Sequence, residues 1–314
     1  MLPLFSGCSA PLIPNPTSDF EYQVNDDNTG IIINKYIGTR QDVVIPSEID
    51  GLPVIFIRGV PIDTYTTDGA FRESNITSVV IPSTVKLIAY GTFANCKELT
   101  TVRFLKNSAL QYIVSYAFWG CEKLEKIDLS DTKLKHIGHS AFKGCTALKE
   151  IKLPDSVEII DAYAFTNCSS LWEIDLPLNL TEIGEMAFEN CTSLHRVVIP
   201  PNLNILFFSR PAFYNVSPSI VFEFEEGWER IDGYAMIICN TDVRVIVPKS
   251  VKRFSSSAFF VSFPGKFEFV FCGDAPEIIE DWLRDPTIYY DPSTSGWDTF
   301  EGKDKFEMIP HIEK

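Results

Sequence analysis

The chain has 314 residues, of which 45% are hydrophobic and 22% are charged, and it carries a formal net charge of −15. A chain of this length and composition can bury a large apolar core in one or two domains. The negative charge argues against binding to nucleic acids and to anionic membrane surfaces, because both require exposed cations.

The charge is unevenly distributed along the chain. Residues 86–216 hold 14 Asp and Glu against 13 Lys and Arg, whereas residues 1–85 hold 10 against 4 and residues 217–314 hold 18 against 10. The middle is therefore nearly neutral and the two ends are acidic. No apolar run reaches the roughly 18 residues that a membrane-spanning helix requires.

We interpret residues 1–18 as a lipoprotein-like leader followed by a tether. The segment LFSGCSAP resembles the end of a bacterial lipoprotein signal, with Cys8 at the position that becomes lipidated. Phe5 replaces the usual leucine, however, and no basic residue or full apolar region precedes Cys8. Two alternatives stay open: a lipid anchor at Cys8, or a plain disordered terminus leading into the proline-rich tether.

A short phrase built around an Ala-Phe pair recurs through most of the chain. Successive copies are 22 to 25 residues apart, and an isoleucine or phenylalanine stands five residues before the second member of nearly every pair. Self-similarity at this length predicts a solenoid whose repeats bury their apolar faces against their neighbours. The second member of the pair stands at Phe71, Phe93, Phe118, Phe142, Phe165, Phe188, Phe213, Met236 and Phe259.

One repeat shows how each coil is expected to fold. In the segment LKEIKLP that ends at Pro154, Ile151 and Leu153 share one face of a strand. Proline lacks the N–H that a ladder needs, so the strand ends there. Val157 and Ile160 follow at a spacing suited to a tight helical or 3-10 turn. Each coil is therefore predicted to contain a strand, a turn and a helical back, with the strands of successive coils stacked in parallel.

The pattern L-x-x-I-x-L-P followed by I-x-x-x-A-F-x-x-C resembles the BspA-like class of leucine-rich repeats found in bacterial surface proteins. This resemblance implies an α/β repeat solenoid, a right-handed superhelix with a parallel sheet on one face and short helical or 3-10 turns on the other. It also implies an N-terminal cap at 19–69, nine repeats at 70–272 and a C-terminal cap at 273–314. Caps are needed because an open end would expose a cross-section of the core.

The cysteines follow the repeat. A valine can neither ligate a metal nor form a disulfide, so its presence in the same slot indicates a need for a small buried side chain, which cysteine supplies. A disulfide or metal site is the alternative. The slot holds Cys96, Cys121, Cys145, Cys168, Cys191 and Cys239, and elsewhere Ser74, Val216 and Ser262.

Other candidate motifs do not support catalysis. His136 and His139 form an H-x-x-H pair without the glutamate that a zinc protease uses as base, so we interpret them as surface histidines. The segment NDDNTG (25–30) lacks the terminal glutamate of a calcium loop and suits a hairpin turn. The nucleophile-elbow, P-loop and dinucleotide-binding motifs are absent from the sequence. We expect no enzyme, no cofactor, no metal and no small-molecule substrate.

The outward strand positions form the remaining candidate site. They predict either a solvated ladder, in which Lys126 neutralises Glu150 and Lys152 neutralises Glu173 or Asp175, or a concave protein-binding face. The candidate binding residues are Arg103, Lys126, Asp128, Glu150, Lys152, Trp172, Glu173, Asp175, Arg196 and Arg244.

The family resemblance implies a non-catalytic, adhesion-type module on the cell surface. Its partner would be a protein, such as a host matrix protein or another surface protein, and its only membrane contact would be a lipid anchor at Cys8. The alternative is a structural scaffold, or a module of an envelope assembly, without a ligand of its own.

Overall fold

The computed structural model describes residues 12–61, 67–201, 203, 212–231, 237–239, 242–255, 259–261, 266–278, 286–300 and 306–311. Several positions named above lie outside these residues, namely Phe5, Cys8, Met236 and Ser262, together with the side chains of Cys239 and Phe259. Of the helices in the described part, none is long and apolar enough to cross a membrane.

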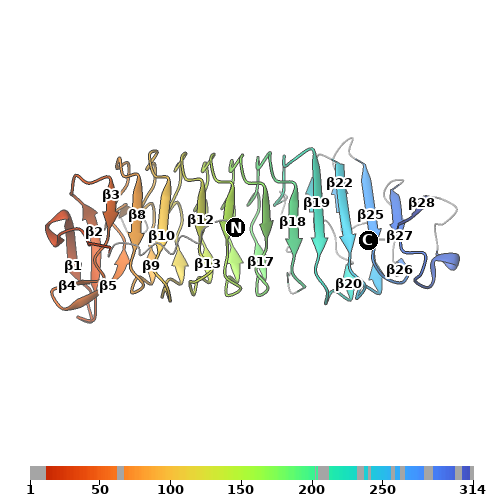
Figure 1. The fold of residues 1–314 in the computed structure, drawn as a ribbon, viewed down its shortest axis with the longest axis horizontal. Helices are drawn as coiled ribbons and strands as arrows, with labels where there is room; N and C mark the ends of the chain where they lie inside the picture. The colour runs from red at the N-terminus through yellow and green to blue at the C-terminus, as the bar shows by residue number, and fades with distance from the viewer. Residues whose placement is uncertain are drawn as a thin grey trace, which may run out of the picture.

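Strands from successive coils stack along the long axis of the molecule in two rows, which lie one above the other in Figure 1. The upper row contains a five-stranded and a seven-stranded parallel sheet, which meet between β14 and β16 without pairing in a ladder. Its strands are β3 (Asp42–Val44), β8 (Ser78–Ile81), β10 (Thr101–Phe104), β12 (Lys126–Asp128), β14 (Glu150–Lys152), β16 (Glu173–Asp175), β18 (Arg196–Ile199), β19 (Ser219–Phe224), β22 (Asp242–Val247), β25 (Phe267–Phe271), β27 (Thr287–Tyr290) and β28 (Glu307–Pro310).

The lower row consists mainly of two-residue strands, each of which follows an upper-row strand and a turn in its own coil. Its parallel pairing runs without a break from β5 to β17 and resumes from β20 to β26. The strands are β5 (Leu52–Ile57), β9 (Leu87–Ile88), β11 (Tyr112–Ile113), β13 (His136–Ile137), β15 (Ile159–Ile160), β17 (Glu182–Ile183), β20 (Arg230–Ile231), β23 (Arg253–Phe254) and β26 (Glu277–Ile278).

The two ends differ. At the N-terminal end, β1 (Phe20–Val24) pairs antiparallel with β2 (Ile31–Tyr36), and β2 continues the lower row in parallel with β5. The hairpin predicted for NDDNTG is confirmed, since the Asn25 side chain accepts hydrogen bonds of 2.9 Å from the Thr29 and Gly30 amides. At the C-terminal end the parallel stacking continues past residue 272 through β27 and β28.

Short elements complete the described structure. Two antiparallel pairs and one parallel pair lie beside the rows, and two short 3-10 helices are found near the ends. They are β4 (Glu48–Ile49) with β5, β6 (Val60–Pro61) with β7 (Thr67–Asp68), β21 (Ile237–Cys239) with β24 (Phe259–Val261), η1 (Thr17–Asp19) and η3 (Trp297–Thr299).

The core is a column of phenylalanine rings, one from each coil. The rings from Phe71 to Phe213 are nearly parallel and buried, and neighbouring centroids lie 4.9 to 5.3 Å apart. Backbone hydrogen bonds join successive coils along the same column. The Phe142 amide donates to the Ala164 carbonyl oxygen at 2.8 Å, and the Phe165 amide donates to the Ala187 carbonyl oxygen at 2.7 Å. The predicted burial of the repeated phenylalanines is confirmed.

Helical backs are not found in the described repeats, where consecutive turns take their place. In five coils, two residues four positions apart adopt positive φ, which a right-handed helix excludes. Between the two residues a turn closes a hydrogen bond from one amide to the carbonyl oxygen three residues before it, as from the Lys143 amide to the Ser140 carbonyl oxygen at 3.2 Å. The positive-φ pairs are Gly91 and Asn95, Tyr116 and Gly120, Ser140 and Gly144, Tyr163 and Asn167, and Met186 and Asn190.

Candidate functional site

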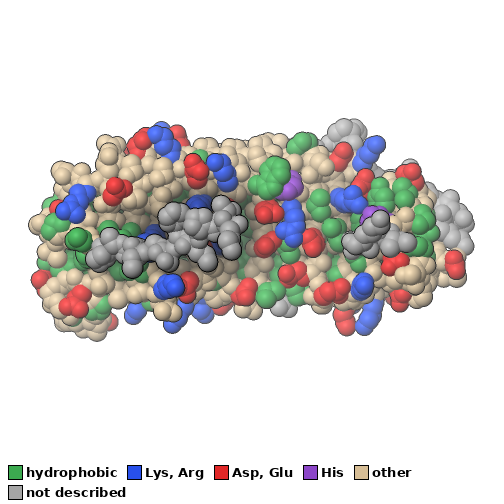
Figure 2. Space-filling view, in the orientation of Figure 1, with side chains coloured by type: hydrophobic (Ala, Val, Ile, Leu, Met, Phe, Trp, Pro, Cys, Tyr) green, Lys and Arg blue, Asp and Glu red, His purple; other side chains and the backbone are tan. Residues whose placement is uncertain are grey.

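The candidate site lies on the outward side of the upper row, which we call the strand face and which carries the sequence-predicted residues. Strand alternation explains the arrangement: in β14, Glu150 and Lys152 are exposed and Ile151 between them is buried. Basic and acidic side chains are interspersed in Figure 2. The predicted residues are Arg103 on β10, Lys126 and Asp128 on β12, Glu150 and Lys152 on β14, Trp172 directly before β16, Glu173 and Asp175 on β16, Arg196 on β18 and Arg244 on β22.

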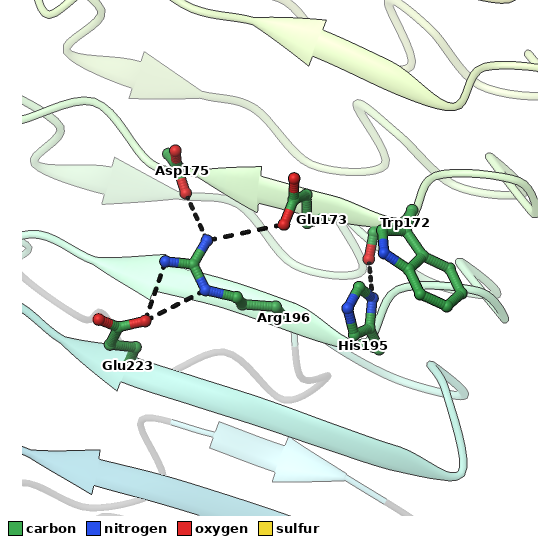
Figure 3. A network of polar contacts seen from close by, with 6 residues as sticks. All are labelled: Trp172, Glu173, Asp175, His195, Arg196 and Glu223. Carbon is green, nitrogen blue, oxygen red and sulfur yellow. Dashed lines mark hydrogen bonds and ion pairs between the residues drawn. The ribbon is translucent and has the colours of Figure 1, made fainter. Parts of the chain in front are cut away.

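Arg196 joins three strands of this face (Figure 3). Its guanidinium donates to Glu223 on β19 at 2.9 and 3.1 Å and to Asp175 at 3.0 Å, and lies 3.7 Å from Glu173. Burial acts to lower the pKa of Arg196, but the hydrogen bonds and charges of Glu223 and Asp175 outweigh it and raise that pKa. Arg196 therefore stays charged and its donors are occupied within the molecule.

Trp172 lies beside this cluster with 57% of its surface exposed. Its ring centroid is 3.8 Å from that of His195, and the Nδ1 atom of His195 is 2.6 Å from the Trp172 carbonyl oxygen. A carbonyl oxygen can only accept a hydrogen bond, so Nδ1 carries the hydrogen. The contact holds a large aromatic ring in place at the edge of the strand face (Figure 3).

The predicted charge ladder is formed in part. Lys126 and Glu150 are register partners on β12 and β14 as predicted, yet the ion pair of Glu150 is with Lys152 on its own strand, at 3.4 Å. Lys152 does not pair with Glu173 or Asp175 in the described part of the chain, where both carboxylates contact Arg196. The strands that carry these groups, β14 and β16, do not pair in a ladder.

A hollow of about 900 Å³ lies over β10, β12 and β14. It brings together one group of predicted residues and leaves Trp172, Glu173, Asp175, Arg196 and Arg244 outside. The predicted residues in its lining are Arg103, Lys126, Asp128, Glu150 and Lys152.

Arg244 lies farther along the row. It is 3.5 Å from Glu268 on β25, and its guanidinium carbon is 5.1 Å from the centroid of the Tyr289 ring. This arginine is thus partnered by neighbouring coils, as Arg196 is.

Comparison with protein-family models identifies the family to which this repeat architecture belongs. A model described as "BspA type Leucine rich repeat region" matches in six copies, over residues 64–161 and 135–263. These matches cover more than half of the chain. The chain belongs to the BspA type leucine-rich-repeat family.

Solved structures with similarity to this BspA-type chain come from bacteria. A leucine-rich repeat protein of T. pallidum (TpLRR) is 26% identical, with 74% of this chain and 86% of that chain covered and a TM-score of 0.45. A leucine rich cell surface protein of Faecalibacterium prausnitzii is 22% identical, with 96% and 89% covered and a TM-score of 0.45. The pneumococcal vaccine antigen PcpA is 19% identical, with 96% and 98% covered and a TM-score of 0.48. No curated protein sequence matches this chain.

The repeated cysteines of this BspA-type chain are buried as predicted. Each thiol also donates a hydrogen bond to the phenylalanine carbonyl oxygen of the preceding coil, for example from Cys145 to Phe118 at 3.2 Å. Burial raises the pKa of Cys145 to about 12 and that of Cys96 to about 11. The fully buried thiols of the slot, which the structure records as free, are Cys96, Cys121, Cys145, Cys168 and Cys191.

The two histidines of the H-x-x-H pair make different contacts. His136 on β13 contacts Asp161 with 2.8 Å between Nε2 and Oδ2, and this hydrogen bond raises the His136 pKa. The ring of His139 lies between those of Tyr116 and Tyr163, tilted by 51° and 55°, with centroids 5.5 and 5.4 Å away. Among the described residues, no group of three metal-ligating side chains is found.

Sequence reasoning missed two residues of the strand face, His195 and Lys106. His195 occupies the repeat slot of Trp172 one coil later, so the stacking of slot-mates was a usable signal. Lys106 follows β10 in a coil whose Phe93-to-Phe118 interval is 25 residues, and this added length places it beside the hollow.

Proposed function

We propose that this chain is a non-catalytic module whose strand face binds a partner protein, with adhesion to a host matrix protein or another surface protein as its role. The exposed Trp172 ring carries the proposal. Tryptophan is enriched among the residues that dominate interface energies. Because His195 already holds the ring, binding would lose little side-chain entropy.

The charged residues around Trp172 support the proposal, because they form a polar rim around this aromatic anchor. Arg196 pairs with Glu173, Asp175 and Glu223, so a partner would meet a fixed surface on which each of these charges already has a partner. Rim charges contribute little individually. The contact is therefore proposed to depend first on Trp172.

We place the module on the cell surface. The F. prausnitzii relative is described as a cell surface protein, which supports this location by analogy. Lipidation at Cys8 is part of the proposal and is tested by metabolic labelling of bacteria with a clickable fatty acid. Label should enter the wild-type chain and should be lost in Cys8→Ser.

The binding proposal is tested with Trp172→Ala. The wild type is assayed by surface plasmon resonance against a panel of purified matrix proteins, and any affinity found is expected to fall about thirtyfold, as for a truncated anchor. Tyr112→Ala is the matched control, because Tyr112 is 41% exposed but lies in the lower row. If only the Tyr112→Ala variant lost binding, the site would be assigned to the lower row instead of the strand face. Absence of wild-type binding across the panel would favour the ligand-free scaffold.

A further inference from the structure

The acidic and the basic residues that line the hollow over β10, β12 and β14 differ in whether they have partners within the molecule. The acidic groups of the hollow are all engaged within the molecule. Glu125 pairs with Lys149 at 3.2 Å, and Glu150 pairs with Lys152 at 3.4 Å.

Two further acids are held by loop residues. Asp128 accepts hydrogen bonds from the Ser130 hydroxyl at 2.5 Å and from the Ser130 amide at 3.0 Å, and the hydroxyl contact lowers the Asp128 pKa. Asp131 accepts from the Asn107 amide at 3.0 Å. The main contacts of both carboxylates are therefore already made within the molecule.

Three of the four cations that line the hollow are in the opposite condition, the exception being Lys152. Arg103, Lys106 and Lys126 are exposed, and in the described part of the chain they form no ion pair and no side-chain hydrogen bond. Arg196 and Arg244 on the same face are both paired. The hollow therefore offers three uncommitted cations within a chain of net charge −15.

We propose that this hollow binds a short, extended acidic segment of the partner protein, with Arg103, Lys106 and Lys126 receiving its carboxylates. The inference rests on the proposed protein-binding function and names the chemistry of the partner.

The register of β10 and β12 sets the distance between two of the cationic positions. Lys126 is the register partner of Thr101, two residues before Arg103 on β10. With about 4.8 Å between strands and about 3.3 Å per residue, the two cationic positions lie about 8 Å apart at the backbone. Carboxylates at alternate positions of an extended peptide are about 6.6 Å apart and project to one side. An acidic residue at every second position therefore fits the pair.

The lining favours a peptide over a uniform polyanion. Asp128, Asp131 and Glu150 stand among the cations and would repel a chain that carries charge on every unit. Phe104 and Leu105 are half-buried in the same lining and suit apolar side chains between the carboxylates. The volume, near the upper end of small-ligand sites, suits a short segment.

The test uses the full chain and three probes in fluorescence anisotropy: a labelled peptide of alternating glutamate and leucine, the same peptide with glutamine for glutamate, and a heparin oligosaccharide. We expect the glutamate peptide to bind more tightly than the glutamine peptide, and its binding to weaken as salt rises. The triple variant Arg103→Gln, Lys106→Gln, Lys126→Gln should weaken it about tenfold, from three partly exposed charge pairs.

A control variant, Lys35→Gln with Lys86→Gln and Lys133→Gln, makes the same change in net charge and should leave the affinity within about twofold. Equal affinity for the two peptides, or equal loss in both variants, overturns the proposal. Heparin binding through the three cations without glutamate-peptide binding also overturns it, in favour of a sulfated glycan. The effect of Trp172→Ala on matrix-protein binding is measured separately, so the broader binding function can stand where this site fails.

Discussion

The phenylalanine column predicts a measurable coupling between neighbouring coils. Phe142 and Phe165 are fully buried, and their ring centroids lie 5.3 Å apart with planes 2° from parallel. Replacing either by alanine removes a buried aromatic side chain and leaves a cavity, which costs roughly 3–5 kcal/mol of unfolding free energy. The contact between the rings is worth about 0.5–1.5 kcal/mol beyond area burial, and each single substitution removes it.

The double variant Phe142→Ala, Phe165→Ala should therefore be less destabilised than the sum of the two single variants, by about 0.5–1.5 kcal/mol. Urea unfolding followed by circular dichroism gives the four free energies of the cycle. Phe93→Ala with Phe188→Ala is the matched control, because three other rings of the column separate these two. The changes in unfolding free energy caused by two distant substitutions should add to within about 0.3–0.5 kcal/mol. Strict additivity for the adjacent pair would refute direct ring-to-ring coupling.

Two further predictions concern titratable groups. Because burial raises the pKa of Cys145 to about 12, the repeated thiols should react with a thiol reagent at pH 8 only after unfolding, and rapid labelling of the native chain would contradict their burial. His136 should favour the folded state most at low pH: its hydrogen bond to Asp161 raises its pKa above 6.5, so its contribution is present below the unfolded pKa and is lost as pH rises through the folded pKa. His136→Gln should accordingly lower the melting temperature more at pH 5.5 than at pH 8, and an equal effect at both would exclude this linkage.

The repeat architecture was accessible from the sequence because one slot asks for one kind of side chain in every coil. The Ala-Phe pair, the isoleucine before it and the cysteine after it each fill a fixed place in the core, so their spacing predicted their burial. The missing helical backs were less accessible. Asn and Gly in the slot before the cysteine signalled positive φ, as at Asn95 and Gly120. Tyr116 and Met186 adopt the same conformation without any such signal, since tertiary packing imposes it.

The candidate site was predictable as a face but not as a set of contacts. Alternation along each strand placed Lys126 and Glu150 outward and side by side. It could not predict that Glu150 would contact Lys152 instead, or that Arg196 would reach across three strands, because long side chains choose among several partners at similar distances. The shared slot of Trp172 and His195 signalled that their rings would be neighbours, but not how the rings would be oriented.

The missing ladder between β14 and β16 gives the solenoid an uneven stiffness. Of the described strands, β13, β15 and β17 continue the lower row across this point, while the upper row has no strand pairing there. A force that bends the molecule is resisted by strand pairing on one side, and on the other by side-chain packing and one long backbone hydrogen bond, from the Trp172 amide to the Lys149 carbonyl oxygen at 3.4 Å. The distance between the hollow and Trp172 is therefore the most compliant dimension of the strand face, and a partner that spans both would adjust it at small elastic cost.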